Sequence, residues 1–280
     1  VHSIYDSHTI LTGQYWDDFL PLPALLDHPA RSMVMIGNAA GTVPRGYRSA
    51  HPEIKVDGVE PDPQVTAAGN RYFDMQGENL TVTAADGRPF LQAAGRKRYD
   101  IVLVDAYRQP YIPFYLTTRE FFELAKGHMQ PGGVLAINIG SAPSDRRIDR
   151  AIAATMRDVF PLVVSRRSGD YNEVVIAVND AAVSVDELRA RVHKATQPSS
   201  SVNAPANKYD GGQIVVRRVP LMQPFDNLNT HDRTGTVAVY TNFADSLVER
   251  KPHPNLLLTD DRAPVEWMTD HMILSAAEAG

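Results

Sequence analysis

The sequence predicts an α/β fold with a doubly wound, mostly parallel sheet that is closed by an antiparallel hairpin. Short apolar segments alternate with helical segments after residue 31, which is typical of parallel strands joined by right-handed crossovers. The segment 99–104 (YDIVLV) is continuously apolar, as expected of a strand that helices cover on both faces. The segments 162–166 and 173–178 are close enough in sequence to pair as the hairpin.

The predicted strands are short, mainly apolar segments followed by turn residues. In chain order they span residues 33–36, 54–59, 80–83, 99–104, 134–139, 162–166 and 173–178. The first runs directly into the small-residue turn 37–41, and the fourth ends in Asp105. This order gives parallel strands whose carboxyl ends meet at one edge of the sheet, where ligands bind in such folds.

The predicted helices lie between these strands and have recognisable start and stop signals. One begins at Thr42, and the others span residues 64–72, 89–94, 118–129, 150–159 and 186–194. Pro63 suits a first helical turn. Thr117 or Thr118 can cap the helix that follows it, and Pro131–Gly133 can stop that helix.

The chain divides by pattern into three parts. We expect residues 1–30 to be a lead-in to the core, residues 31–180 to form the α/β domain, whose strand ends are the place for a nucleoside-type ligand, and residues 181–280 to form a C-terminal extension. Within the extension, residues 197–207 are rich in serine, proline, alanine and asparagine, a composition typical of a loop.

Composition excludes several classes of function. The 28 basic and 33 acidic residues give a net charge of -5, so nucleic acid is not an expected partner. The absence of cysteine excludes thiolate chemistry, and the nine histidines lack the close pairing of a metal site. No segment reaches the roughly 18 apolar residues that span a bilayer. A cytoplasmic protein is expected, or a cytoplasmic domain whose membrane portion lies outside the chain, which begins at Val1.

The turn between Gly37 and Gly41 is the first candidate for ligand binding. Small residues let the backbone approach a ligand, and the start of the next helix offers free N–H groups. The same residues also suit tight packing between a strand and a helix. The sequence leaves both interpretations open.

Acidic residues follow the next two predicted strands. Glu60 follows the second strand, where a carboxylate can accept hydrogen bonds from both hydroxyls of a ribose. Asp86, followed by Gly87, ends the third strand, where a carboxylate can accept from an adenine amino group. The alternative role for Asp86 is to cap the helix that follows. These residues, with Gly37 and Gly41, form the predicted nucleoside site.

Two further carboxylates are candidates for catalysis. Asp105 ends the fourth strand and can bind a cationic amine or sulfonium by charge; its alternative is an ion pair with Arg108 or another basic neighbour. Asp260 belongs to an acidic cluster with Asp261 and Glu266 that can attract an amine, or simply cap a helix.

These residues resemble the polyamine aminopropyltransferases, the spermidine synthase family. The resemblance covers residues 1–140 and rests on the following segments: Ser3–Tyr5, Leu11–Trp16, Gly37–Gly41, Val59–Asp62, Ala85–Gly87 and Tyr99–Asp105. The tail 258–266 (LTDDRAPVE) is similar to a form found in spermidine synthase-like domains, including ones fused to membrane segments. The resemblance implies the sheet of class I S-adenosylmethionine-dependent transferases.

The sequence departs from the family pattern at two positions. The family carries an acidic residue in its glycine-rich loop that contacts the aminopropyl end of decarboxylated S-adenosylmethionine; here that position is Ala40. The family also places two aspartates three residues apart after the fourth strand. Asp105 matches the first, but Arg108 stands at the second, where it cannot act as a base and would repel a cationic amine.

The resemblance implies a transferase that moves an aminopropyl group from decarboxylated S-adenosylmethionine to an amine such as putrescine. The nucleoside is then a cosubstrate and no cofactor is tightly bound. Because Ala40 and Arg108 depart from the pattern, two alternatives stay open. They are a methyltransferase that uses intact S-adenosylmethionine and a non-catalytic ligand-binding domain. A homodimer would be ordinary for the family.

Overall fold

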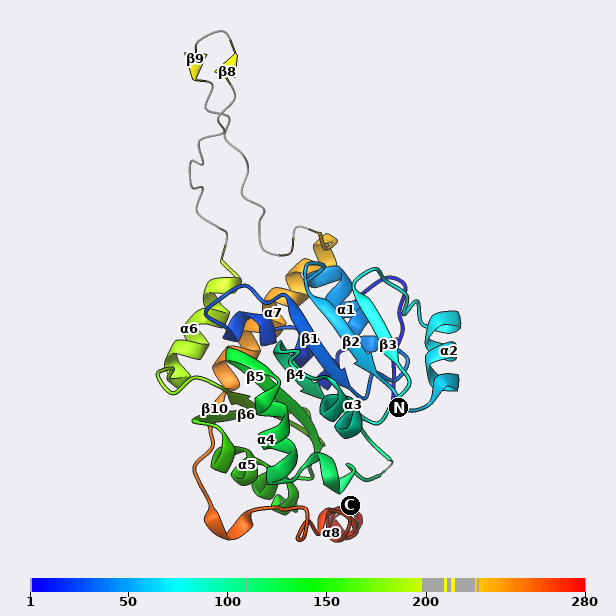
Figure 1. The fold of residues 1–280 in the computed structure, drawn as a ribbon, viewed down its shortest axis with the longest axis vertical. Coiled ribbons are helices and arrows are strands. Elements are labelled where there is room, and N and C mark those ends of the chain that lie inside the picture. Colours follow the sequence, from blue (N-terminus) through cyan, green and yellow to red (C-terminus); the bar gives the residue numbers. More distant parts are fainter. Residues whose placement is uncertain are drawn as a thin grey trace.

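The alternating segments form an eight-stranded sheet with helices on both faces in the computed structural model (Figure 1). The structure describes residues 2–108, 110–197, 225 and 227–279, and the backbone of residues 209–210 and 213–214. The strands of the sheet are β1 (Ser32–Ile36), β2 (Lys55–Val59), β3 (Leu80–Thr83), β4 (Tyr99–Val104), β5 (Met129–Gly140), β6 (Leu162–Ser168), β7 (Asn172–Val178) and β10 (Val248–Glu249). A separate pair is formed by β8 (Tyr209–Asp210) and β9 (Gln213–Ile214).

The strand order is β10-β6-β7-β5-β4-β1-β2-β3. Strands β1 to β5 are parallel to one another, whereas β7 pairs antiparallel with both β5 and β6. The chain moves outward from β1 to β3 and then returns to pair β4 with the other side of β1. This topological switch point places the carboxyl ends of β1 and β4 side by side, where open α/β sheets bind ligands. The predicted doubly wound sheet and its closing hairpin are confirmed.

The helices lie close to their predicted positions where a prediction was made. They are α1 (Thr42–Ala50), α2 (Pro63–Tyr72), α3 (Gly87–Ala93), α4 (Arg119–Gly127), α5 (Arg147–Val159), α6 (Val185–Ala195), α7 (Thr230–Ser246) and α8 (Val265–Ala279). Short 3-10 helices are η1 (Tyr15–Phe19), η2 (Leu22–Leu25), η3 (Phe114–Leu116) and η4 (Pro254–Leu256). The carboxylate of Asp62 caps α2 by accepting from the N–H of Gln64, and Thr118 caps α4 through the N–H of Phe121.

The start of β5 differs from the prediction. The sequence predicts a strand that begins at Val134, with Pro131–Gly133 as the stop of the preceding helix. In the structure β5 begins at Met129 and includes these three residues. Its register with β4 shifts between Tyr99 and Ile101. Gly132 has a φ of +72°, so this glycine supplies a left-handed residue inside an irregular strand instead of only ending a helix.

Two hydrophobic clusters cover the two faces of the sheet. Alternate residues of β1 point to opposite faces, because side chains alternate along a strand: Met33 and Met35 join one cluster, and Val34 and Ile36 join the other. The first cluster includes side chains of α1, α6 and α7, and the second includes side chains of α3, α4 and α5. Helices therefore bury both faces, as the apolar segment 99–104 predicts.

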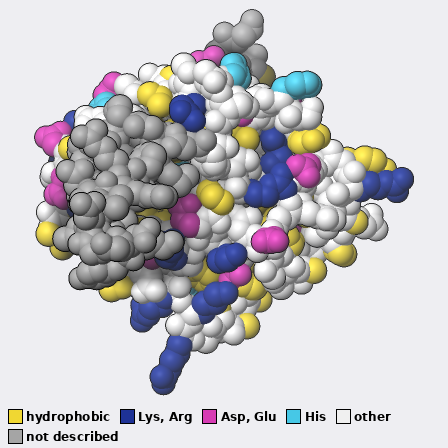
Figure 2. Space-filling model, turned by 90° about the horizontal axis from the view of Figure 1, so that it is seen from above, with side chains coloured by type: hydrophobic (Ala, Val, Ile, Leu, Met, Phe, Trp, Pro, Cys, Tyr) yellow, Lys and Arg dark blue, Asp and Glu magenta, His cyan; other side chains and the backbone are white. Residues whose placement is uncertain are grey.

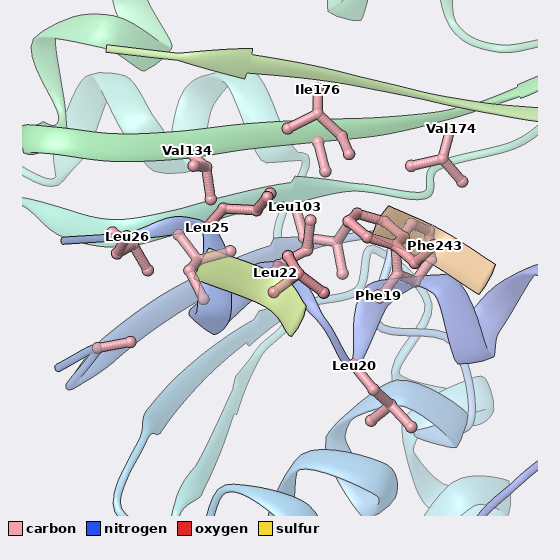
Figure 3. Close-up of a cluster of buried hydrophobic side chains, with 14 of the residues drawn as sticks. Phe19, Leu20, Leu22, Leu25, Leu26, Leu103, Val134, Val174, Ile176 and Phe243 are labelled. Atoms are coloured by element: carbon pink, nitrogen blue, oxygen red, sulfur yellow. The ribbon is translucent and has the colours of Figure 1, made fainter. Parts of the chain in front are cut away.

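Both segments that flank residues 31–180 contribute to this core. Figure 3 shows Phe19 of the lead-in beside Phe243 of α7. Leu22 and Leu25 belong to the same buried cluster, which also contains Ile176 of the sheet. From the C-terminal side, β10 pairs with β6 and forms the outer edge of the sheet. Apart from Gln197, the predicted loop at 197–207 lies outside the described residues.

Charged side chains are interspersed on the surface that Figure 2 shows, where Lys and Arg lie among Asp and Glu. Among the described residues, the helices are too short or too polar to cross a bilayer.

A buried ion cluster ties the edge of the sheet together. The side chain of Glu173 on β7 is 1% exposed and forms ion pairs with both Arg146 and Arg250. Arg250 directly follows β10 and also donates from Nε to the hydroxyl of Ser165 at 2.6 Å. Arg146 in turn pairs with the buried Asp149. One carboxylate therefore links β7, the start of α5 and the outermost strand.

Replacing this carboxylate will destabilise the fold. We expect Glu173→Gln to lower the free energy of unfolding by about 3 kcal/mol, because two guanidinium groups lose their buried partner. Urea unfolding followed by circular dichroism measures the change. The matched control is Glu187→Gln, since Glu187 pairs with Arg191 on an exposed helix surface and such pairs contribute about 0.5 kcal/mol. Equal effects of the two substitutions would contradict the prediction.

Candidate active site

A cavity of about 260 Å³ lies at the carboxyl ends of the central strands. Its lining comes from the ends of β1, β2 and β4 and from the segments that follow β3 and β4. The residues that line it are His2, Ile36, Gly37, Ala39, Val59, Glu60, Pro61, Val65, Asp86, Gly87, Asp105, Ala106, Tyr107, Arg108, Pro113, Tyr115 and Leu116. Glu60, Asp86 and Asp105, predicted separately from sequence, thus face one cavity.

Glu60 is buried at the end of β2, with 8% of its surface exposed. Its Oε2 accepts a hydrogen bond from the N–H of Ala39 at 2.9 Å, and its Oε1 accepts from the N–H of Asp62 at 3.1 Å. These bonds fix the plane of the carboxylate. Each oxygen can accept a further hydrogen bond, so the pair is arranged to receive two neighbouring hydroxyls.

Close packing requires the glycines of the turn. Gly37 has a φ of +88°, and a Cβ built on it would lie 2.3 Å from the carbonyl oxygen of Asp105. Gly41 has a φ of +89°, and its Cβ would lie 2.2 Å from Cγ of Met75. The packing interpretation therefore accounts for both glycines. Gly37 and Ala39 also line the cavity, so the turn both packs tightly and borders the candidate site.

Asp86 has two roles in the structure. Its Oδ1 caps α3 by accepting from the N–H of Arg88 at 3.1 Å, which confirms the capping alternative. Its Oδ2 accepts from the hydroxyl of Tyr115 across the cavity wall. Burial, together with this neighbouring carboxylate, raises the pKa of Tyr115 to about 12. The adjacent Gly87 lies against Ile36, where a Cβ would approach Cγ2 at 2.2 Å.

Asp105 is the most constrained carboxylate of the cavity. Its Oδ1 accepts from Asn138 Nδ2 at 3.0 Å, and its Oδ2 accepts from the hydroxyl of Tyr15 and from Nε1 of Trp16, both at 3.2 Å. Burial raises its pKa to about 6, and these hydrogen bonds oppose the rise. Its partners among the described residues are thus neutral donors, and not Arg108 or another basic neighbour.

Three of these neighbours were not predicted as site residues. Tyr15 and Trp16 come from η1, far from Asp105 in sequence, and Asn138 lies near the end of β5. Asn138 Oδ1 accepts from Asn172 Nδ2 at 3.1 Å, which extends the network to β7. A polar residue inside the otherwise apolar segment 134–139 is the signal that marks Asn138 from sequence alone.

Asp260 is not brought to this cavity. Arg88 donates to both of its oxygens, at 2.7 Å and 2.6 Å, and Thr118 Oγ1 donates to Oδ1 at 2.7 Å. Asp260 is absent from the lining of the cavity, and the hydrogen bond from Arg88 lowers its pKa. A carboxylate held by a cation in this way is a poor proton acceptor, so the structure favours a structural role for Asp260.

A second cavity of about 270 Å³ is lined in part by Tyr15. Its lining is polar and includes Gln14, Asp17, Asp18, Arg166 and Asn172. Asp18 is 4% exposed. Burial raises its pKa to about 6, and the charge of Arg166 opposes the rise.

The described residues contain no group of three or more histidine or carboxylate side chains arranged to hold a metal ion.

Known proteins resemble the chain in sequence and in fold. No protein-family model matches it. A probable polyamine aminopropyl transferase from Bifidobacterium longum (strain NCC 2705) is 31% identical over 278 residues, which are 96% of this chain and 56% of that protein. The chain spans about half the length of the curated relatives that it matches.

Solved structures share the fold. A probable spermidine synthase from Corynebacterium glutamicum ATCC 13032 matches with a TM-score of 0.53 and 19% identity over 68% of this chain and 82% of that one. Human methyltransferase-like protein 13 in complex with SAH matches with a TM-score of 0.51 and 20% identity over 85% of this chain and 90% of that one.

The contact between Asn138 and Asp105 can be tested by titration. Because Asn138 is the first of the hydrogen bonds that lower the pKa of Asp105, we expect Asn138→Ala to raise that pKa by roughly one pH unit above its value near 6. Carbon-13 NMR of the aspartate carboxyls, assigned with Asp105→Asn, measures it. Asn242→Ala, an exposed change at the second cavity, is the control. An unchanged or lowered pKa in Asn138→Ala would contradict this role.

Proposed function

We propose that this chain, which is similar to a probable polyamine aminopropyl transferase over 96% of its length, is a divergent, spermidine synthase-like transferase. It would move an aminopropyl group from decarboxylated S-adenosylmethionine to an amine such as putrescine. The observation that carries the proposal is the convergence of Glu60, Asp86 and Asp105 on one cavity at the switch point of the sheet. The nucleoside is a cosubstrate that enters and leaves with each turnover.

The first two carboxylates suit the nucleoside. Glu60 presents two oriented oxygens to the ribose hydroxyls, and Asp86, at the far wall beside Tyr115, accepts from the adenine amino group. Apolar lining from Val59, Val65 and Leu116 covers the faces of the base. Such a mixture of apolar walls and a few fixed polar groups is typical of cosubstrate cavities.

Asp105 suits the reacting centre. In the proposed reaction the amine nitrogen attacks the carbon next to the sulfonium; a C–N bond forms, the C–S bond breaks, and methylthioadenosine leaves with the sulfur electron pair. The attacking nitrogen loses a proton, which the carboxylate of Asp105 accepts. With a pKa of about 6 the group is mostly ionised at neutral pH, and its three donors hold it in position for this role.

The second cavity offers the acceptor a route to this centre. It shares Tyr15 and Asn172 with the hydrogen-bond network of Asp105. The carboxylates of Asp17 and Asp18 in its lining outnumber the single guanidinium of Arg166, so the cavity favours a cationic ligand such as a diamine.

Methyl transfer from intact S-adenosylmethionine is the second candidate. It is favoured by Ala40, which removes the acidic loop group that the family resemblance assigns to recognition of the aminopropyl end. The same fold also holds SAH in human methyltransferase-like protein 13. Mass spectrometry of the amine product distinguishes an added aminopropyl group from an added methyl group.

Nucleoside binding will depend on Glu60. We expect Glu60→Ala to weaken the affinity for methylthioadenosine by about 30-fold in calorimetry, because two hydrogen bonds to a charged acceptor are lost. The control is Glu78→Ala, a change at an acidic residue outside the cavity lining. An affinity that Glu60→Ala leaves intact would contradict the assignment of the ribose site.

Transfer will depend on Asp105 in its ionised form. We expect the rate in wild-type protein to rise with pH through about 6, because the carboxylate accepts a proton only above its pKa. Asp105→Asn should reduce the rate at least 100-fold and leave methylthioadenosine binding within a few-fold of wild type. The rate of spermidine formation from putrescine measures both. A pH profile without this rise would remove Asp105 as the base.

A further inference from the structure

The second cavity has polar walls that come from distant parts of the chain. Its lining comes from η1 and the residues just before it, from the hairpin of β6 and β7, and from α7. The residues that line it are Gly13, Gln14, Tyr15, Asp17, Asp18, Arg166, Ser168, Gly169, Asn172, Val239 and Asn242. Among these residues only Val239 has an aliphatic side chain. Water or a small polar ligand fills a cavity with such walls.

The two aspartates of this cavity differ in how far the protein satisfies them. Asp17 Oδ1 accepts from the N–H and the hydroxyl of Thr12, and its Oδ2 accepts from the N–H of Gly13, all at 2.8 Å. Asp18 Oδ1 lies 3.0 Å from Nη1 of Arg166. Its Oδ2 is buried and has no hydrogen-bond partner of good geometry among the described residues. Asp18 therefore has capacity for a further donor.

The guanidinium of Arg166 is also incompletely satisfied. Its Nε donates to the carbonyl of Arg167 at 3.3 Å, and its Cζ lies 5.8 Å from the ring centre of Phe243. Nη1, which faces Asp18, is buried without a well-aligned acceptor in the described part of the chain. Burial raises the pKa of Asp18, and the charge of Arg166 and the hydroxyl of Ser168 oppose the rise. Because a buried ion pair needs further hydrogen bonds to offset its desolvation, this pair suits a ligand that supplies them.

The charge of Arg166 limits which amines fit. A diamine carries an ammonium at each end, and an ammonium that approaches Asp18 also approaches the guanidinium beside it and is repelled. A carboxylate next to that ammonium removes the repulsion, since it pairs with the guanidinium. The head group of an α-amino acid carries both charges on one carbon. A diamino acid also keeps a net positive charge, which matches the excess of Asp17 and Asp18 over Arg166.

The cavity shares its walls with the reacting centre. Tyr15 lines it and donates to Asp105 at 3.2 Å. Asn172 lines it as well and donates to Asn138, which in turn donates to Asp105. A molecule whose head group lies in the cavity can therefore extend a flexible carbon chain past Tyr15 toward Asp105.

We propose that the second cavity binds the α-amino acid head group of the acceptor, with its ammonium at Asp18 and its carboxylate at Arg166, so that the acceptor is a diamino acid. The inference rests on the proposed function and names the class of amine that the transferase uses. The amine at the far end of the molecule is the nucleophile. Its nitrogen forms the C–N bond as the C–S bond of the sulfonium breaks, and Asp105 accepts its proton.

The experiment compares ornithine with putrescine, because ornithine is putrescine with a carboxylate on the carbon next to one amine. Calorimetric titration of the whole chain measures binding of each amine without turnover. We expect wild type to bind ornithine about tenfold more tightly, since a charge-assisted contact with Arg166 is gained. Mass spectrometry of the products formed with decarboxylated S-adenosylmethionine should show the same preference in kcat/KM.

A double variant removes the proposed contacts and leaves no buried charge unpaired. Asp18→Asn combined with Arg166→Gln should abolish the preference for ornithine and leave methylthioadenosine binding within a few-fold of wild type. The matched control is Arg167→Gln, a change at the neighbouring arginine, which lies outside the cavity lining and donates to Ser141 and to the carbonyl of Asp170. This control should keep the preference.

Three results would overturn the inference. One is a preference that survives the double variant, and another is a preference that Arg167→Gln reduces equally. The third concerns Arg108, which lines the nucleoside cavity and offers another guanidinium to a carboxylate. A preference that Arg108→Gln abolishes and the double variant does not would place the carboxylate in the nucleoside cavity.

The same measurements separate the inference from the proposed function. If wild type binds putrescine at least as tightly as ornithine and converts it to spermidine, the proposed function stands and the inference is wrong. If ornithine binds with the expected preference but neither amine receives an aminopropyl group, the amino acid site stands and the proposed function fails. If neither amine binds or reacts, both fail.

Discussion

Burial of the Asp105 carboxylate is the constraint on which the candidate site depends. A carboxylate away from water needs donors, and here they come from η1 and β5, with a further amide from β7 behind Asn138. To hold one charge, the chain must bring the lead-in, the switch point of the sheet and the closing hairpin to the same place. Tyr15, one of these donors, also lines the second, polar cavity.

The central part of the fold was predictable because its signals are local. Each strand from β1 to β7 is a short apolar segment bounded by turn residues, and each crossover helix has a cap or a stop within a few residues. The carboxylates at the strand ends were predictable for the same reason: parallel topology alone brings Glu60, Asp86 and Asp105 to one edge. Strand β10 was not predictable, because a strand of two residues shows no periodicity. The residue that follows it, Arg250, forms an ion pair with Glu173, which is distant in sequence.

The polar network around the site lay beyond sequence reasoning for a different reason. Tyr15 and Trp16 lie 90 and 89 residues from Asp105, and no short-range pattern records such a contact. For Asp260 the sequence prediction erred in the other direction. Asp260 and Asp261 form a conspicuous acidic pair in the sequence, but Arg88 and Thr118 hold Asp260 outside the cavity lining. Charge in a sequence identifies a carboxylate but not its partner.

The long range of these contacts also has a consequence for how the chain reaches this structure. Thr9 bonds to Asp232 at a separation of 223 residues, and Phe19, Leu22 and Leu25 lie in the same buried cluster as Ile176 and Phe243. During synthesis these residues leave the ribosome long before their partners exist. Contacts of such high sequence separation form slowly, so the apolar lead-in stays exposed until α7 has emerged. This part of the core is therefore completed only after α7 has been synthesised.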